Sequence, residues 1–304
     1  MKHHCFRVAL LAACAGIAPL LHAQPEWKLR ASLLNAEALH LAALGEHRKA
    51  LVLFQQVFEL DATARTHCFD AVSSALASGD TALANTFLRM GVQHGFDPAR
   101  FAGASDLRTH LQSPASLSFR NGWQHDRDVF ASRCDSAMIK AIEAMHEADQ
   151  AARRGKGYTE ETWRVDSLNF EKLLARTEKH GFPTEHALGL SVGSVHLLLW
   201  HHRPPVYPHS TQWQRMLPYI RAAIAAGDVS PSYLCMFEDM AAFEEGRPQP
   251  YGTLLFYFNQ QPDLLHLTDR ETLNRDRTSV GLGPIEWSAQ EAGIDLATVR
   301  FAEP

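Results

Sequence analysis

Apolar residues recur along much of the chain at the spacing of amphipathic helices. One such stripe covers residues 138–152 and another covers residues 216–224, with polar positions between the apolar ones. Residues 188–200 are strongly apolar, which indicates a buried helix. Gly181 and Gly227 follow predicted helices and mark their ends. The pattern predicts an all-α fold.

The first third of the chain contains an internal repeat. Gly45 and Gly79 are 34 residues apart, and the same offset relates Ala50 to Ala84. This is the period of the tetratricopeptide repeat, a helical hairpin in which glycine suits the end of the first helix. The segments GEHRKALVLFQQVFELD and SGDTALANTFLRMGVQHGF resemble the second halves of two such units. The proline that closes a unit in this family is missing, since Ala62 occupies its place.

The resemblance to tetratricopeptide repeats implies helical hairpins over residues 24–112 and a partner protein or peptide on their concave face. Two units offer little concave surface, so we favour the alternative that they support the second domain. A short helix over residues 106–111 is expected to close the repeats. Residues 113–125 are polar and turn-rich, which predicts a linker. Residues 126–304 then form a compact helical domain.

The amino terminus has the composition of a secretory signal peptide. A basic region precedes an apolar stretch over residues 8–21, and a small-residue cleavage site ends at Ala23. The stretch is shorter than the roughly 20 residues that a membrane span requires. We expect an exported protein, periplasmic or secreted, from which residues 1–23 are removed. In the alternative, the lipobox-like sequence that ends at Cys14 directs acylation and a lipoprotein anchor.

Charge and cysteine content narrow the classes of partner. Without residues 1–23 the net charge is −7, against −5 for the whole chain, which argues against nucleic acid as a partner. Cys68, Cys134 and Cys235 allow one disulfide at most, and Cys134 with Cys235 is one pairing, although we favour buried free thiols. The chain contains no CxxC, HExxH, P-loop or dinucleotide motif. We therefore predict no metal and no cofactor.

Several polar residues stand next to apolar helical stripes. Asp149, Gln150 and Arg153 share one helix edge, which is either solvated, as we favour, or lines a cleft. His201 ends the apolar segment, and we expect its ring to be hydrogen-bonded and able to act as an acid or base. Asp239 lies on an otherwise apolar face. Because an isolated buried carboxylate is costly, it needs a partner, with Arg275 or Arg277 as candidates.

Twelve positions within residues 133–290, approximately, match the pattern of one protein family: Met145, Asp149, Gln150, His201, Asp239, Gln249, Tyr251, Gly252, Thr253, Arg277, Gly281 and Leu282. At these positions the chain resembles bacterial domain-of-unknown-function family 6624. The resemblance implies an all-helical domain and a set of candidate site positions, and it assigns no reaction. This chain departs from the family at Met240 and Leu254, where the family often has arginine and glutamine, so any chemistry of those groups is altered.

Two functions compete for these residues. We expect a protein-interaction or scaffold module with a polar cleft in its C-terminal domain. Its binding candidates are Asp149, Gln150, Arg153, Gln249 and Thr253. The alternative is a hydrolase or transferase acting on a small anionic or acyl substrate. Its catalytic candidates are Asp149, His201, Asp239, Tyr251 and Arg277, with aspartate or histidine as general base and Tyr251 and Arg277 stabilising negative charge.

Overall fold

The computed structural model describes residues 24–101, 103–154, 159–203, 206–258 and 261–302. The predicted signal peptide, with Cys14, lies outside these residues. The described chain is predominantly helical, which confirms the all-α prediction. Its one sheet is an antiparallel pair of short strands, β1 (Phe256–Phe258) and β2 (Gln261–Asp263). No helix in the described part of the chain has both the length and the apolarity to cross a membrane.

The repeats form two helical hairpins, and the predicted end of the first helix of each hairpin, at Gly45 and at Gly79, is confirmed. Gly45 and Gly79 have φ angles of 76° and 78°, the left-handed conformation that ends a helix and favours glycine. The equivalent residues Ala50 and Ala84 are fully buried, as close helix contact requires. The four helices are α1 (Glu26–Ala43), α2 (His47–Leu60), α3 (Phe69–Ala77) and α4 (Thr81–Val92).

Two further helices extend the array, with α5 (Ser105–Gln112) in contact with α3 and α6 (Leu117–Ala131) in contact with α4. Residues 113–125, predicted as a linker, lie in a short 3-10 helix and in α6. Buried Asp126 holds α6 against α4, because it accepts hydrogen bonds from Arg89 Nε at 3.0 Å and Gln93 Nε2 at 2.6 Å. This stretch therefore packs as part of the helical array.

The second helical group packs around a core of aromatic residues. Phe170, Trp213 and Phe237 are fully buried, and their rings are in contact. The prediction of a single helix over residues 188–200 is wrong for its first turn. Gly189 adopts a φ of 54°, and residues Gly189–Ser191 form a 3-10 helix before α10 begins. The helices are α7 (Ser136–Arg153), α8 (Glu160–His180), α9 (Glu185–Leu188), α10 (Val192–His201), α11 (Thr211–Ala226) and α12 (Cys235–Glu244).

Two close contacts join the repeats to the second helical group. Gly95 and Gly189 bring their backbones together, since a Cβ on Gly95 would lie 2.6 Å from the Cα of Gly189. Beside them, His67 Nε2 lies 3.0 Å from a carboxylate oxygen of Glu185 in α9. The hairpins are therefore docked on the second group and do not project from it.

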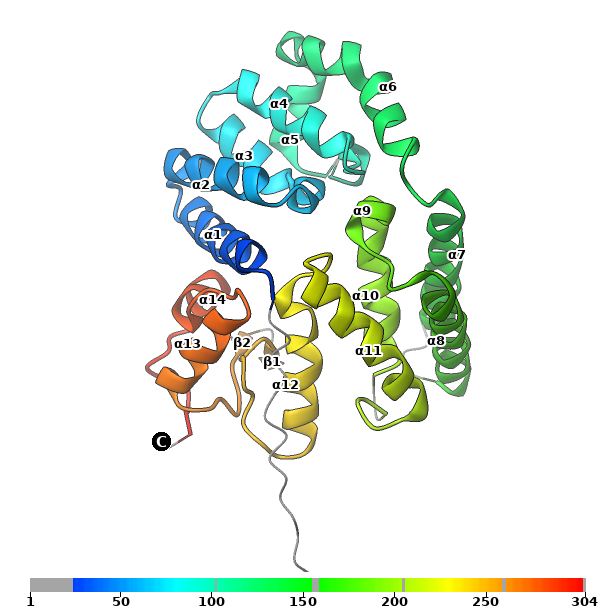
Figure 1. Cartoon of the computed structure of the whole chain (residues 1–304). Helices are drawn as coiled ribbons and strands as arrows, with labels where there is room; N and C mark the ends of the chain where they lie inside the picture. The colour runs from blue at the N-terminus through cyan, green and yellow to red at the C-terminus, as the bar shows by residue number, and fades with distance from the viewer. Residues whose placement is uncertain (1–23, 102, 155–158, 204–205, 259–260, 303–304) are drawn as a thin grey trace, which may run out of the picture.

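The C-terminal lobe consists of the segment after α12 together with α13 (Arg270–Ser279) and α14 (Ile285–Ala292). It has its own small core, to which Leu264, Leu267 and Leu273 belong. Figure 1 shows α1 beside α14, so the first hairpin and the C-terminal end of the chain lie next to each other. His40 of α1 stacks on Trp287 of α14 with ring centroids 4.7 Å apart. The repeats thus pack directly against the C-terminal lobe.

The three cysteines that the structure describes are free. Cys68 and Cys235 are buried and Cys134 is partly exposed. Burial raises the pKa of Cys235 well above its ordinary value, because the thiolate would lose its hydration. Cys68 and Cys235 agree with the expectation of buried free thiols, whereas Cys134 is free but not buried. The buried thiol of Cys235 remains neutral and unreactive at physiological pH.

Candidate functional site

The predicted edge of α7 forms a first polar cluster with groups from α8 and α10. Asp149 is fully buried, and its carboxylate accepts hydrogen bonds from Arg153 Nη1 and Gln150 Nε2, each at 2.7 Å. His201 Nδ1 lies 2.8 Å from the same carboxylate. Arg153 also bonds both oxygens of buried Asp166, each at 2.8 Å. The edge is therefore an internal network and not the solvated surface that we favoured.

The two carboxylates of the first polar cluster have opposite pKa shifts. Burial acts to raise the pKa of Asp149, but hydrogen bonds from His201 and Gln150, together with nearby positive charge, outweigh it and lower the pKa. Burial raises the pKa of Asp166, and Arg153 offsets this only in part. Asp149 is consequently the ionised partner that orients the imidazole of His201. With Nδ1 donating to Asp149, Nε2 is the ring atom that remains for proton transfer.

A metal ion is not the best fit to the first polar cluster. Ligand atoms of Asp149, Asp166 and His201 lie within 4.8 Å of one another, close enough to surround a cation. Arg153, however, donates to both carboxylates and supplies the positive charge between them. A metal ion would have to displace this guanidinium. We interpret the cluster as an arginine-bridged network.

A second polar cluster surrounds the turn after α12. Asp239 is fully buried, and one of its oxygens accepts the backbone N–H of Tyr251 at 2.8 Å. The other oxygen accepts both the backbone N–H and the hydroxyl of Thr253, each at 2.6 Å. Burial raises the pKa of Asp239, and these bonds offset the shift only in part. Asp239 therefore fixes the turn from the α12 side.

Arg277 supports the same turn from the opposite side, but it is not the ion-pair partner expected for Asp239. The guanidinium of Arg277 donates to the carbonyl of Tyr251 at 2.7 Å, the carbonyl of Gly283 at 2.6 Å and the hydroxyl of Ser288 at 2.7 Å. No ion pair within 4 Å joins Asp239 to an arginine in the described chain. Backbone N–H groups satisfy the carboxylate instead, and carbonyl oxygens satisfy the guanidinium.

Tyr251 lies near the carboxyl group of Glu238 in α12. Burial and the charge of that carboxyl group raise the pKa of Tyr251. Burial likewise raises the pKa of Glu238. Tyr251 contributes to the turn through its backbone, which Asp239 and Arg277 hold.

Gln249 connects the turn to the next segment of the chain. Its side chain is buried, donates to the carbonyl of Leu265 at 2.6 Å and accepts the N–H of Leu254 at 3.2 Å. Its backbone N–H donates to the carbonyl of His266 at 2.5 Å. His266 has a φ of 53°, a conformation that non-glycine residues adopt only when their surroundings hold it. Gln249 supplies this restraint.

The candidate catalytic residues thus lie in two clusters and not around one pocket. Asp149 and His201 belong to the first polar cluster, and the other candidates belong to the second. The helices that carry them meet through apolar rings, with Trp200 and Phe237 centroids 5.5 Å apart. Among the described residues, no hydrogen bond or ion pair joins the two clusters. The geometry does not assemble the joint active site of the alternative function.

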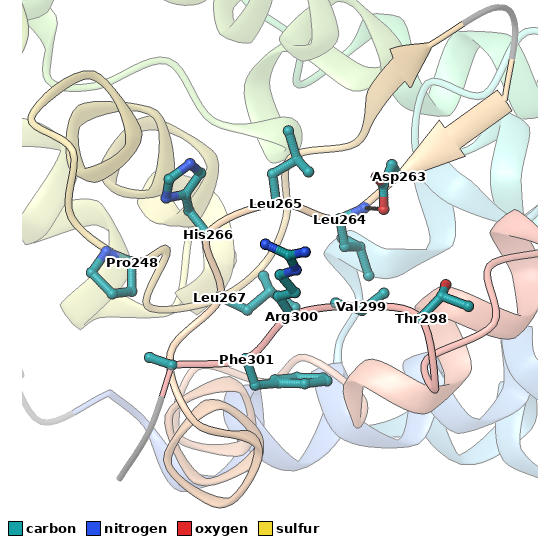
Figure 2. Close-up of a pocket in the computed structure, with 11 residues that line it drawn as sticks. Pro248, Asp263, Leu264, Leu265, His266, Leu267, Thr298, Val299, Arg300 and Phe301 are labelled. Atoms are coloured by element: carbon teal, nitrogen blue, oxygen red, sulfur yellow. Dashed lines mark hydrogen bonds between the residues drawn. The ribbon is translucent and has the colours of Figure 1, made fainter.

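A pocket of about 510 Å³ lies next to the second polar cluster, in the C-terminal lobe. We call it the C-terminal pocket; it is lined by Pro248, residues 263–267 and residues 298–302. Figure 2 shows Arg300 extending toward Leu265, with His266 and Asp263 on either side. The second polar cluster does not line the pocket. Through Gln249 it fixes the segment that forms one wall.

Four residues were not predicted from the sequence: Asp166 in the first polar cluster, and Asp263, His266 and Arg300 in the pocket. Asp166 stands on the buried face of α8, a signal equivalent to the one that singled out Asp239. Asp263 ends the three-residue strand β2, and His266 and Arg300 stand in irregular segments, so no periodicity marks these residues and only the fold brings them together.

A serine in the α9–α10 region has the spacing of a hydrolase motif. Residues 189–193, GLSVG, match the GxSxG pattern, which requires a strand before the serine and a helix after it. Here α9 precedes Ser191, and its hydroxyl bonds the carboxylate of Glu143 at 3.2 Å. The nucleophile elbow is therefore not formed.

No protein-family model, curated protein or solved structure matches the chain. The resemblances to tetratricopeptide repeats and to domain-of-unknown-function family 6624 stay predictions. Function must be argued from the geometry.

Proposed function

We propose that this chain is a protein-interaction module that binds a segment of a partner in the C-terminal pocket. The observation that carries the proposal is the restraint of the pocket wall. Buried Gln249 bonds to Leu265 and His266, and Asp239 and Arg277 hold the turn that follows Gln249. A preformed wall lowers the entropy cost of binding, because the ligand does not have to order it.

The pocket has the composition of a recognition site. Leu264, Leu267 and Val299 are buried beneath it, whereas His266 and Arg300 are exposed at its edge. Sites for small ligands and peptide segments commonly combine an apolar floor with a few polar groups that fix orientation. This corresponds to the polar cleft expected in the C-terminal domain, with different residues lining it.

In this proposal the repeats act as a scaffold for the pocket. The stacking of His40 on Trp287 joins α1 to α14, and Ser32 packs against Gly281 at the end of α13. These contacts favour a supporting role for the hairpins over an independent peptide-binding array. We also propose that the protein works after export, in the periplasm or outside the cell, on the basis of its amino-terminal sequence.

Calorimetric titration of the purified protein with pools of short synthetic peptides tests the proposal. We expect saturable binding that Arg300→Gln weakens, because Arg300 is the cation in the pocket. Arg108→Gln is the matched control, since Arg108 is also exposed but lies on α5, outside the pocket. Equal binding by both variants, or no binding of any pool, would contradict the proposal.

A second candidate function rests on His201 and Asp149. A buried carboxylate 2.8 Å from Nδ1 is the arrangement that orients a histidine for proton transfer at Nε2. It supports acid–base chemistry of a hydrolase or transferase on a small acyl or anionic substrate. Among the described residues no nucleophile is hydrogen-bonded to His201, so the interaction module is the better-supported function.

Hydrolysis of a panel of acyl and phosphate esters tests this candidate. Activity that is lost in His201→Gln and retained in His209→Gln would favour it, because His209 is exposed and belongs to neither polar cluster. Equal rates for the two variants would show that any hydrolysis comes from elsewhere.

A further inference from the structure

The C-terminal pocket contains two opposite charges that do not pair with each other. Asp263 and Arg300 both line it, and neither forms an ion pair with any residue that the structure describes. One oxygen of Asp263 accepts the N–H of Leu264 at 2.8 Å, which orients the carboxylate and leaves the second oxygen for a ligand. Figure 2 shows Asp263 at the end of β2 and Arg300 on the C-terminal segment, extending toward Leu265.

The opposite signs of the charges on Asp263 and Arg300 restrict which ligands fit the pocket. An anion bound by Arg300 alone would experience repulsion from Asp263, and a cation at Asp263 would experience repulsion from Arg300. A ligand that carries both charges satisfies both groups. Hydrogen bonds between ionised partners are about twice as strong as neutral ones, so the match contributes to affinity as well as to selectivity.

The floor of the pocket adds an apolar requirement. Leu265 and Phe301 line the pocket and are partly exposed, whereas Leu264 and Leu267 beneath them are each 1% exposed, so the accessible apolar surface of the pocket comes from Leu265 and Phe301. An aliphatic side chain on the ligand would bury its surface there. The pocket volume of about 510 Å³ lies within the range of roughly 300–1,000 Å³ that small ligands occupy.

We propose that the C-terminal pocket binds short peptides with free ends, the carboxylate at Arg300, the ammonium at Asp263 and an aliphatic side chain on the floor. This inference rests on the proposed function, because it names the class of segment that the pocket takes. The partner segment is then a short peptide released from its parent chain, because an internal segment of a folded chain has neither free end.

Four forms of one dipeptide test the inference: alanyl-leucine, its N-acetyl derivative, its C-terminal amide and the doubly blocked form. Binding to the purified protein is measured by calorimetry. Each blocking group removes one charge, and we expect each to weaken binding about tenfold, the equivalent of one charge-assisted hydrogen bond.

Two variants assign each charge to its partner. In Arg300→Gln the free acid and the amide should bind equally, while the effect of N-acetylation persists. In Asp263→Asn the free amine and the N-acetyl form should bind equally, while the effect of amidation persists. Asparagine keeps an oxygen for the Leu264 N–H, so Asp263→Asn preserves the wall. Unchanged thermal melting of both variants confirms that they fold.

The outcomes separate this inference from the proposed function. If the doubly blocked dipeptide binds as well as the free one and Arg300→Gln weakens it, the pocket binds peptides but the charge assignment is wrong. If no form binds and longer blocked peptides bind in the pocket, the free-ended class is likewise wrong. If nothing binds there, the inference and the proposed function both fail.

Discussion

Asp239 and Arg277 hold the backbone of Tyr251 from opposite sides without contacting each other as an ion pair. Asp239 accepts the N–H of Tyr251 at 2.8 Å, and Arg277 donates to its carbonyl at 2.7 Å. Both side chains are almost completely buried, with exposures of 0% and 3%. The turn between them therefore neutralises two buried charges through its peptide groups, and it is held in a single conformation.

This arrangement predicts unequal effects of two substitutions at Asp239. Asp239→Asn keeps one acceptor oxygen, whereas Asp239→Ala leaves three N–H or O–H donors unpaired and removes the buried charge nearest to Arg277. Because loss of one member of a buried charged network typically costs roughly 3–5 kcal/mol, we expect Asp239→Ala to reduce the free energy of unfolding by that amount. Asp239→Asn should cost clearly less. Urea unfolding measures both, and equal losses would contradict the account.

Arg153 should be essential to the first polar cluster, because it bridges Asp149 and Asp166. Arg153→Gln leaves two buried carboxylates without their cation, and we expect a loss of roughly 3–5 kcal/mol in the free energy of unfolding. In the double variant with Asp166→Asn, part of the loss should be recovered, since one of the unpaired charges is gone. Additive losses in the double-mutant cycle would show that the two groups do not interact.

Buried His202 predicts a loss of stability in acid. Neither ring nitrogen has a hydrogen-bond partner in the structure, the residue is 6% exposed, and burial lowers its pKa to about 4 from the ordinary value of 6.5. The unfolded chain therefore binds a proton at a higher pH than the folded chain. The stability contribution of neutral His202 is complete above pH 6.5 and is lost as the pH falls toward about 4.

His202→Leu isolates this effect. Between pH 7 and pH 4 the natural protein should lose up to roughly 3 kcal/mol more than the variant, because one pKa unit corresponds to about 1.36 kcal/mol. Urea unfolding at several pH values gives the difference between the two pH profiles, in which any packing change caused by leucine cancels. Parallel profiles would mean that His202 does not titrate on unfolding in this range.

His67 has the opposite pH dependence. Burial acts to lower its pKa, but the hydrogen bond to Glu185 and the charge of that carboxylate outweigh it, so the pKa is raised above 6.5. The contact between the repeats and α9 is therefore fully formed below pH 6.5 and weakens as the pH rises through the pKa of the folded state. The side chain is 54% exposed, so the energetic effect is small.

Nuclear magnetic resonance measures this pKa directly. The titration midpoint of His67 should lie above 6.5 in the natural protein and should fall in Glu185→Gln, which keeps the size of the side chain but removes its charge. Glu178→Gln is a matched control, because Glu178 pairs with Arg215 elsewhere on the surface. An unchanged midpoint in Glu185→Gln would contradict the assignment.

The sequence predicted those features that depend on local chemistry. The 34-residue period placed Gly45 and Gly79 at left-handed helix ends, and the single carboxylate on an apolar face identified Asp239 as buried and hydrogen-bonded. Its actual partners are backbone N–H groups, which no residue pattern specifies. The prediction of Arg277 as its ion-pair partner was wrong for that reason.

Features that depend on long-range packing could not be predicted. The polar turn-rich composition of residues 113–125 suggested a linker, but α4 offers a surface on which this stretch folds as a helix. The C-terminal pocket joins residues 263–267 to residues 298–302 through the bridge between Leu267 and Phe301. Pairing between such short, irregular segments has no sequence periodicity.

Amide chemical-shift mapping shows whether the C-terminal pocket binds a peptide segment of a partner, because it locates the residues whose surroundings change on binding. The purified, isotope-labelled protein is titrated with the alanyl-leucine dipeptide and with the pooled peptides. The account predicts saturable shifts concentrated on residues 263–267 and 298–302, reduced in Arg300→Gln and unchanged in Arg108→Gln. Saturable shifts confined to other parts of the molecule, or no shifts at all, would contradict it.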